Sequence, residues 1–162
     1  MSRTIVEPKP GVEMGRVVVS ITVENADDRE RADRGELRPE DVRRVETDAL
    51  VDSGATYLCM PESMIASLGL KFHRPRESRT ITGPITLNVY RGAAIEVQGR
   101  VVTDEVLGLP EGRQVLLGQI PLEKLDFWVD VVNHRLVGNP EHGGQWMAEV
   151  FEVVRAADAA GG

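Results

Sequence analysis

The part of this sequence best suited to chemistry is a short polar run that directly follows an apolar stretch. Ala49-Leu50-Val51 is typical of the end of a buried strand, and Asp52-Ser53-Gly54-Ala55-Thr56-Tyr57 follows it. An acidic residue at the end of such a strand, with Ser-Gly in a tight turn behind it, predicts a rigid carboxylate that water can just reach. Because a carboxylate in such a place is costly to maintain, we expect it to have a function.

Asp-Ser-Gly also occurs in ordinary turns, because Asp and Ser side chains readily bond to their own backbone. The following residues favour a functional site over a simple turn. Residues 58–70 predict a short helix, with Pro61 near its start, apolar residues at helical spacing and Gly69 at its end. Residues 115–125 repeat the plan, with an apolar strand, Gly118 and then a second short helix.

Together these two segments resemble the retropepsin-like aspartic proteases (clan AA), the single-domain retroviral type and its bacterial relatives. In that family an Asp-Thr/Ser-Gly loop is followed, after a flap hairpin, by two apolar residues and a glycine that lead into a helix. The resemblance covers residues 14–142 and implies a mostly β fold. The expected fold is a small closed β-barrel with one or two short helices, which forms one lobe per chain.

The resemblance also implies roles for the residues of the two motifs. Asp52 is the expected catalytic residue. Ser53 is expected to bond across a dimer to the partner loop, and the Gly54 amide is expected to steady the carboxylate. Gly118 is expected where the chain crosses so close behind the loop that a side chain would intrude, although it could equally just end a strand.

Substrate contacts are expected on either side of an extended peptide. The backbone at Ala55 and Thr56 is expected to hold the peptide from below, although retroviral members usually have Asp where Thr56 stands. The flap tip is expected at Thr82-Gly83-Pro84-Ile85, where Pro84 removes one amide donor and stiffens the turn.

Aspartic protease chemistry needs two carboxylates about a hydrogen bond apart, one ionised and one protonated, because two like charges that close cannot both ionise. The sequence contains one Asp-Ser-Gly, and neither Asp104, Asp126 nor Asp130 is followed by Ser/Thr-Gly. The second carboxylate must then come from another copy of the chain across a two-fold axis. The sequence therefore predicts an endopeptidase that acts on peptides or proteins as a homodimer, with no cofactor, and an inactive monomer.

A rival from another class is a non-catalytic dimer that keeps the fold and binds extended peptides without cleaving them. The retained Asp52 favours the enzyme, whereas Thr56 and Pro84 keep the binding module open as an alternative.

Other reactive side chains carry weaker signals. His73, His134, His142 and Glu141 show no recognised metal-ligand spacing, so no metal site is predicted. Cys59 lies near the Asp52 motif, and we interpret it as a small core residue because no histidine has a claim to be its base.

Composition narrows the class of protein further. A chain of 162 residues with 41% apolar residues supports one domain with a real core. The net charge of −7 argues against a nucleic-acid partner. No apolar stretch approaches the roughly 18 residues of a membrane span, and the longest one, residues 17–23, has the length of a strand. A single cysteine is compatible with a reducing cytoplasm, which is the location we expect.

The remaining sequence predicts the elements that position the motifs. We expect a loose arm at residues 1–13, an exposed charged loop at residues 25–36, and a short element of its own near residues 38–43. The expected strands are 17–23 and 45–51, a flap hairpin of 79–82 and 85–90 that turns at Gly83-Pro84, a hairpin of 93–98 and 101–103 that turns at Gly99-Arg100, and a closing hairpin of 127–132 and 134–137. Residues 143–162 are expected to form a short helix, with an apolar stripe that starts at Trp146, and a disordered tail.

Overall fold

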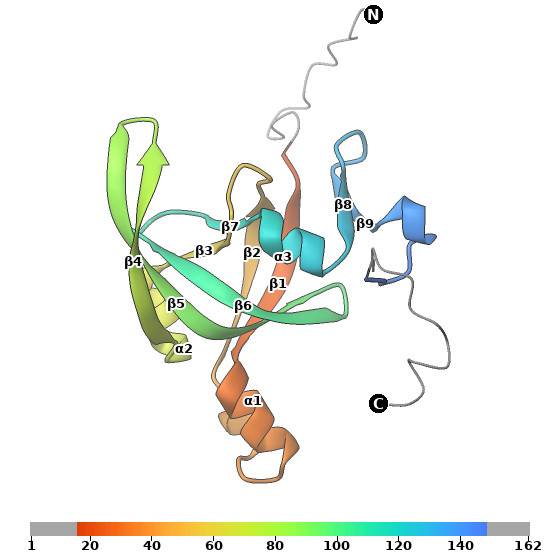
Figure 1. The fold of residues 1–162 in the computed structure, drawn as a ribbon. Helices are drawn as coiled ribbons and strands as arrows, with labels where there is room; N and C mark the ends of the chain where they lie inside the picture. The colour runs from red at the N-terminus through yellow and green to blue at the C-terminus, as the bar shows by residue number, and fades with distance from the viewer. Residues whose placement is uncertain (1–15, 149–162) are drawn as a thin grey trace, which may run out of the picture.

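The computed structural model describes residues 16–148, and strands dominate them. Within this range the chain forms nine strands, three short α-helices and two 3-10 helices, at Pro39–Asp41 and Pro140–His142. The other elements are, in chain order, β1 (Val18–Asn25), α1 (Ala26–Asp33), β2 (Arg44–Val51), β3 (Leu58–Pro61), α2 (Glu62–Leu68), β4 (Lys71–Thr80), β5 (Gly83–Val97), β6 (Arg100–Leu109), β7 (Val115–Leu117), α3 (Gln119–Lys124), β8 (Phe127–Asp130) and β9 (Arg135–Gly138) (Figure 1).

Six strands close into a barrel. They follow the order β1-β2-β7-β3-β6-β5, and a further pairing of β1 with β5 closes the ring. β4 extends the sheet outside the ring, because within the described chain it pairs with β5 alone. The predicted mostly β fold with a small closed barrel is confirmed, with three short helices instead of the expected one or two. The core is aliphatic and includes the fully buried Val23, Leu58, Met60, Ile65, Ile95, Val97 and Leu117.

The strands that lead to the Asp52 motif lie where the sequence predicts them. β1 alternates as expected, because Ile21 and Val23 are buried while the residues between them are more exposed. β2 pairs with β1 in antiparallel register and delivers Asp52 at its end. Along both strands, more buried and more exposed side chains alternate, which explains why the sequence shows a pattern of period two.

The predicted loop at residues 25–36 is wrong, because most of it forms helix α1. The Asn25 side chain caps this helix by accepting a hydrogen bond of 3.0 Å from the Asp28 amide. Asp28 is buried and accepts bonds of 2.7 Å from Arg43 Nε and 3.0 Å from Arg43 Nη2, and this guanidinium lowers the pKa of Asp28. Since these contacts are polar, α1 has no apolar stripe to reveal it. The short element expected near residues 38–43 is present as the first 3-10 helix.

The helix predicted for residues 58–70 occupies only the second part of that segment. Leu58–Pro61 forms strand β3 instead, which pairs with both β6 and β7 and is buried along its whole length. Pro61 therefore precedes the helix rather than opening it from within. α2 ends at Gly69 as predicted, in a left-handed conformation with φ of 64°.

The hairpin formed by β4 and the first part of β5, which we call the flap hairpin (residues 71–91), turns earlier than predicted. Its last pair is Thr80 with Gly83, so the turn is made by Ile81 and Thr82 rather than by Gly83 and Pro84. The Thr80 hydroxyl, which donates to the Gly83 carbonyl at 2.7 Å, stabilises this turn. Pro84 lies in β5 opposite Arg79, next to the last pair, Thr80 with Gly83. In an antiparallel ladder this position is not hydrogen-bonded across the pair, so the N–H that proline lacks is not needed there.

β5 continues from the flap hairpin into the barrel as one long strand, so the two hairpins predicted around it share that strand. A bulge between Tyr90 and Ala93 separates its two parts, and Gly92 at the bulge has φ of 90°, which glycine adopts without strain. The second turn falls at Gln98 and Gly99, one residue earlier than predicted.

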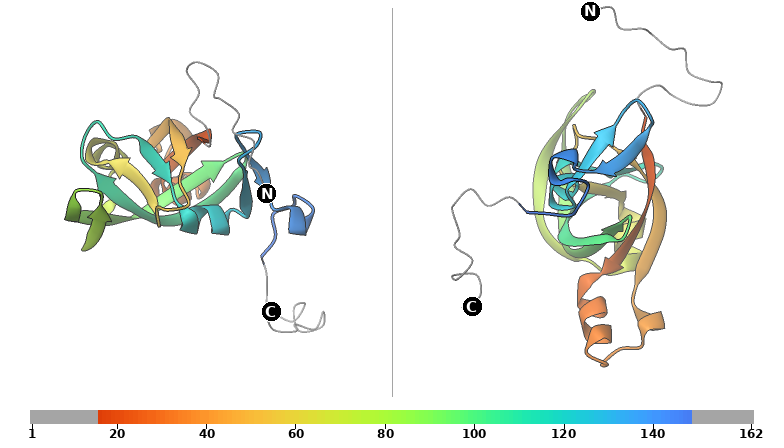
Figure 2. Two further views of the ribbon diagram at one scale, coloured as in Figure 1. Left: turned by 90° about the horizontal axis from the view of Figure 1, so that it is seen from above. Right: turned by 90° about the vertical axis from the view of Figure 1, so that its right-hand side faces the viewer.

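The closing hairpin is confirmed as β8 and β9, with Asn133 in its turn. Figure 2 shows that the flap hairpin and the β8–β9 hairpin lie on opposite sides of the barrel. The predicted arm at residues 1–13 and most of the predicted C-terminal helix lie outside the described residues, although Trp146 and Met147 are described and are not helical. Across residues 16–148, no helix has the length and apolar character needed to cross a bilayer.

Candidate active site

The loop at residues 52–57, which we call the Asp52 loop, joins β2 to β3 at the end of the barrel toward which the flap hairpin projects (Figure 1). β2 and β3 both pair with β7, so the two ends of the loop are attached to the same short strand. The Asp52 amide continues this attachment by donating to the Leu117 carbonyl at 3.0 Å. The loop is therefore fixed at its base.

The Asp52 carboxylate is half-buried and has an internal donor. The Gly54 amide donates to Asp52 Oδ1 at 2.9 Å, and the Ala55 amide donates to the Asp52 carbonyl at 3.1 Å. Asp52 Oδ2 has no hydrogen-bond partner among the described residues. A carboxylate held on one oxygen and open on the other can accept a proton from water and, once protonated, can donate one to a substrate oxygen.

Gly118 lies directly behind the Asp52 loop. A Cβ atom at this position would lie 2.7 Å from the Ala55 carbonyl oxygen and closer still to that of Tyr57. Because both neighbours are backbone atoms, no change of rotamer could make room. This close approach is the arrangement expected from the sequence. It explains why a glycine is needed at position 118, beyond marking the end of β7.

The first amides of α3 bind the carbonyl groups of the same loop. Gln119 N–H donates to the Ala55 carbonyl at 2.7 Å, and Ile120 N–H donates to the Thr56 carbonyl at 3.0 Å. The loop positions expected to contact substrate through their backbone are thus already tied to α3. Ser53, Gly54 and Thr56 are exposed.

The flap residues expected to contact substrate lie at the far end of the flap hairpin. Thr82 is in the turn, and Gly83 and Pro84 begin β5. The Thr82 hydroxyl bonds within the hairpin, since Thr80 Oγ1 lies 3.1 Å from Thr82 Oγ1. The described chain therefore brings Asp52 together with Ser53, Gly54 and Gly118, and holds the tip residues apart from them.

Tyr57, for which the sequence predicted no role, connects the loop to the flap hairpin. Its ring is buried in a cluster that includes Val89 and Leu87 of β5. Its hydroxyl accepts hydrogen bonds from Arg76 Nη1 at 2.9 Å and from Arg74 Nη2 at 3.3 Å. Arginines at alternate positions of a strand would have predicted this basic face, but the strand expected from the sequence starts only at residue 79.

Cys59 has the role predicted for it. It is 3% exposed within the same cluster as Tyr57. Burial, with a smaller contribution from the Asp52 charge, raises the pKa of the thiol to about 12. The thiol therefore remains protonated near neutral pH and is not a nucleophile.

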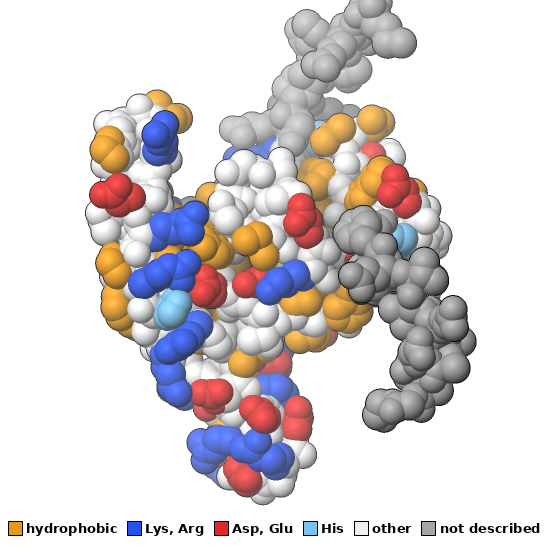
Figure 3. Space-filling model, viewed as in Figure 1, with side chains coloured by type: hydrophobic (Ala, Val, Ile, Leu, Met, Phe, Trp, Pro, Cys, Tyr) orange, Lys and Arg blue, Asp and Glu red, His pale blue; other side chains and the backbone are white. Residues whose placement is uncertain are grey.

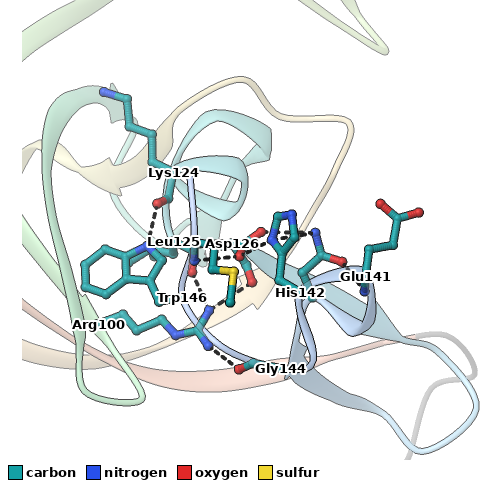
Figure 4. A network of polar contacts seen from close by, with 10 residues as sticks. Arg100, Lys124, Leu125, Asp126, Glu141, His142, Gly144 and Trp146 are labelled. Atoms are coloured by element: carbon teal, nitrogen blue, oxygen red, sulfur yellow. Dashed lines mark hydrogen bonds and ion pairs between the residues drawn. The ribbon is translucent and has the colours of Figure 1, made fainter. Parts of the chain in front are cut away.

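An open groove of about 1110 Å³ begins beside Ser53. Its walls come from α3, β8 and the segment after β9, and include Gln119, Trp128, His142, Trp146 and Met147. Figure 4 shows the polar network that holds the segment after β9 in place.

Arg100 and Asp126 are the two centres of this network. Arg100 donates to the carbonyl groups of Leu125 at 2.7 Å, Asp126 at 2.9 Å and Gly144 at 2.7 Å. The Asp126 carboxylate lies 2.7 Å from His142 Nδ1 and accepts from the Asn139 side chain at 3.1 Å. These contacts, led by the one with His142, lower the pKa of Asp126 to about 2.

The low pKa of Asp126 predicts how stability depends on pH. Because the folded value of about 2 lies below the ordinary value of 3.8, the contribution of this carboxylate is present above pH 3.8. It is lost as the pH falls toward 2. The melting temperature of Asp126→Asn should therefore lie below that of wild type at pH 5, and the gap should narrow as the pH approaches 2.

Thermal unfolding followed by circular dichroism at several pH values measures this gap. His142→Ala removes the largest cause of the shift, so it should weaken the pH dependence over the same interval. A gap between wild type and Asp126→Asn that stays constant from pH 5 to pH 2 would contradict the prediction.

The histidines considered as metal ligands lie apart from one another. His142 contacts Asp126, His73 lies 3.8 Å from Glu105, and His134 Nδ1 lies 3.2 Å from a backbone carbonyl. Among residues 16–148, no group of three or more His, Cys, Asp and Glu side chains is arranged to hold a metal ion.

Comparison with known proteins agrees with this geometry. Residues 40–124 match the model of a family described as gag-polyprotein putative aspartyl protease. The match runs from the 3-10 helix before β2 to the end of α3, so it includes the Asp52 loop, the flap hairpin and Gly118. A search among curated proteins found no match. Because the matched residues make up more than half of the chain, the protein belongs to this retropepsin-like aspartyl protease family.

Proposed function

We propose that the protein is an aspartic endopeptidase that is active as a homodimer, with one Asp52 from each chain in a shared site. The observation that carries this proposal is the Asp52 carboxylate itself, held on one oxygen by the Gly54 amide at 2.9 Å and open on the other. The sequence provides only one Asp-Ser-Gly, so the second carboxylate has to come from a second copy.

The proposed reaction uses one ionised and one protonated Asp52. The ionised carboxylate takes a proton from water, and the water oxygen adds to the peptide carbonyl carbon. The protonated carboxyl gives its proton to the carbonyl oxygen, which yields a tetrahedral diol. When the C–N bond breaks, the carboxyl group that took the proton from water gives it to the amine nitrogen, and one hydroxyl of the diol returns a proton to the other carboxylate, so that an amine and a carboxylic acid are released and the pair again holds one proton. Because the two groups share one proton, the pH dependence belongs to the pair.

The groove beside Ser53 supports the proposal of a second copy. It starts at the Asp52 loop, and its walls carry large apolar side chains that are about half exposed, with Trp128 and Trp146 at 47% and Met147 at 50%. Val131 and Val132, at the turn of the neighbouring β8–β9 hairpin, are exposed to 58% and 80%. Aromatic residues and methionine are enriched where proteins associate, so a partner chain here would bury an apolar surface next to the loop.

Dilution provides the test of this proposal. The protein is incubated with a mixed peptide pool between mildly acidic and neutral pH, and new peptide ends are identified by mass spectrometry. Below the dissociation constant of the dimer, a tenfold dilution should lower the rate per chain by about tenfold, because the dimer fraction falls in proportion to concentration. Sedimentation velocity measures that fraction on the same samples.

Two results would contradict the proposal. A rate per chain that is unaffected by dilution, in samples that sediment as monomers, would exclude a shared site. A dimer that binds peptides without producing new ends would favour the non-catalytic binding module.

A further inference from the structure

The flap hairpin presents an arginine toward the Asp52 loop. In the β4–β5 register, Arg76 lies directly opposite Leu87 and Arg74 lies opposite Val89. Directly opposite residues of an antiparallel pair point to the same face. Leu87 and Val89 belong to the cluster around Tyr57, so this is the face that turns toward the loop.

The two arginines differ in how their charges are balanced. Arg74 forms an ion pair with Glu105, with 3.3 Å between Arg74 Nη1 and Glu105 Oε1. Arg76 is exposed and has no carboxylate within ion-pair distance among the described residues. Since the guanidinium group does not lose its proton near neutral pH, Arg76 keeps a full positive charge.

Tyr57 holds this charge in place. The guanidinium carbon of Arg76 lies 5.2 Å from the centre of the Tyr57 ring, and Nη1 donates to the Tyr57 hydroxyl at 2.9 Å. Stacking on a ring orients a guanidinium while leaving most of its N–H groups free to bind a carboxylate side by side. Arg76 is thus a preorganised anion-binding group beside the loop that carries Asp52.

We propose that Arg76 makes this site select peptides that carry Asp or Glu a few residues from the bond to be cleaved. This inference rests on the proposed function, since the cleaved bond is defined by Asp52. In a two-fold dimer each chain contributes one Arg76, so the preference falls on both sides of the bond. Figure 3 shows Lys and Arg side chains along the flap hairpin, next to the notch that separates it from the rest of the molecule.

The preference is local rather than a property of the whole protein. The net charge of −7 repels acidic peptides at long range. Arg76 therefore selects a position within the peptide and not peptides of high negative charge. A solvated guanidinium–carboxylate pair corresponds to a preference of about twofold to fivefold, which weakens as salt is added.

The test compares cleavage sites. Wild type, Arg76→Gln and Arg79→Gln are incubated with the same peptide pool, and the residues around each cleaved bond are counted by mass spectrometry. Arg79 is a matched control, because it lies on the same strand but pairs with Pro84 on the opposite face. Wild type and Arg79→Gln should enrich Asp and Glu at fixed positions, and Arg76→Gln should lose that enrichment. Circular dichroism verifies that each variant is folded.

A second measurement separates this inference from the proposed hydrolysis. Immobilised Asp52→Asn protein, with and without Arg76→Gln, retains peptides from the same pool, and the retained peptides are identified. Cleavage without Asp or Glu enrichment, or with enrichment that survives Arg76→Gln, overturns the inference and leaves the hydrolase proposal standing. No cleavage, but retention of acidic peptides that depends on Arg76, overturns hydrolysis and supports only the part of the inference by which Arg76 selects acidic peptides. No cleavage and no acidic retention overturns both.

Discussion

Asp52→Asn is expected to reduce peptide hydrolysis by at least about a thousandfold, because the substitution removes both the general base and the general acid from the shared site. An amide has nearly the same shape as a carboxyl group, and the oxygen of the new side chain can still accept the hydrogen bond from the Gly54 amide. The fold and the dimer should therefore remain. The measurement is the initial rate of cleavage of one peptide selected from the pool, with the dimer fraction determined by sedimentation.

Asp48→Asn is the matched control for this substitution. Asp48 lies four residues earlier on β2, is exposed and bonds to the Ser20 hydroxyl at 3.0 Å, so it should keep wild-type activity. Mixing wild type with Asp52→Asn gives a sharper result, because only dimers with two wild-type chains retain both carboxylates. At the same total protein concentration, an equal mixture should have about a quarter of the activity of wild type alone, rather than half of it. Activity of one half would count against a site shared between chains.

Gly118→Ala is expected to destabilise the fold by about 3 kcal/mol, and to lower hydrolysis through displacement of the Asp52 loop. The added Cβ would lie 2.7 Å from the Ala55 carbonyl oxygen and 2.9 Å from the Thr56 carbonyl carbon. Gly118 has φ of −88°, a conformation open to any residue, so the loss would come from contact and not from backbone strain. Urea denaturation measures the change in the free energy of unfolding.

Gly108→Ala serves as the control, since it adds the same atom in β6, which β3 separates from β7. There the three atoms nearest to the Cβ would all belong to the carboxylate end of Glu62, a flexible side chain that can rotate away at the expense of its hydrogen bond from the Tyr90 hydroxyl. This variant should remain within about 1 kcal/mol of wild type. Equal losses in the two variants would show that the Asp52 loop does not depend on the close approach at Gly118.

The sequence predicted those elements that are marked by a pattern of apolar residues close together in the chain. Alternating side chains identified β1 and β2, and the repeated strand-glycine-helix plan identified the Asp52 loop and Gly118. Helix α1 was missed because polar contacts between Asn25, Asp28 and Arg43 stabilise it, and Arg43 is distant in sequence.

The turn of the flap hairpin was misplaced for a related reason. Gly83 and Pro84 are common turn residues, but the hairpin register and the Thr80 hydroxyl place the turn at Ile81 and Thr82. The contact of Arg76 with Tyr57 spans 19 positions of the sequence, so it became visible only once the strands were paired. Side-chain partners that meet through tertiary pairing have no local pattern to reveal them.

The position of β7 makes the Asp52 loop a fixed part of the barrel, in contrast to the flap hairpin. Val115–Leu117 pairs on one side with the strand that enters the Asp52 loop and on the other with the strand that leaves it. The loop has no local opening of its own, because freeing either end means breaking the ring of strands. β4 lies outside that ring, so in the proposed enzyme we expect the flap hairpin to move when a peptide binds, while Asp52 keeps its place.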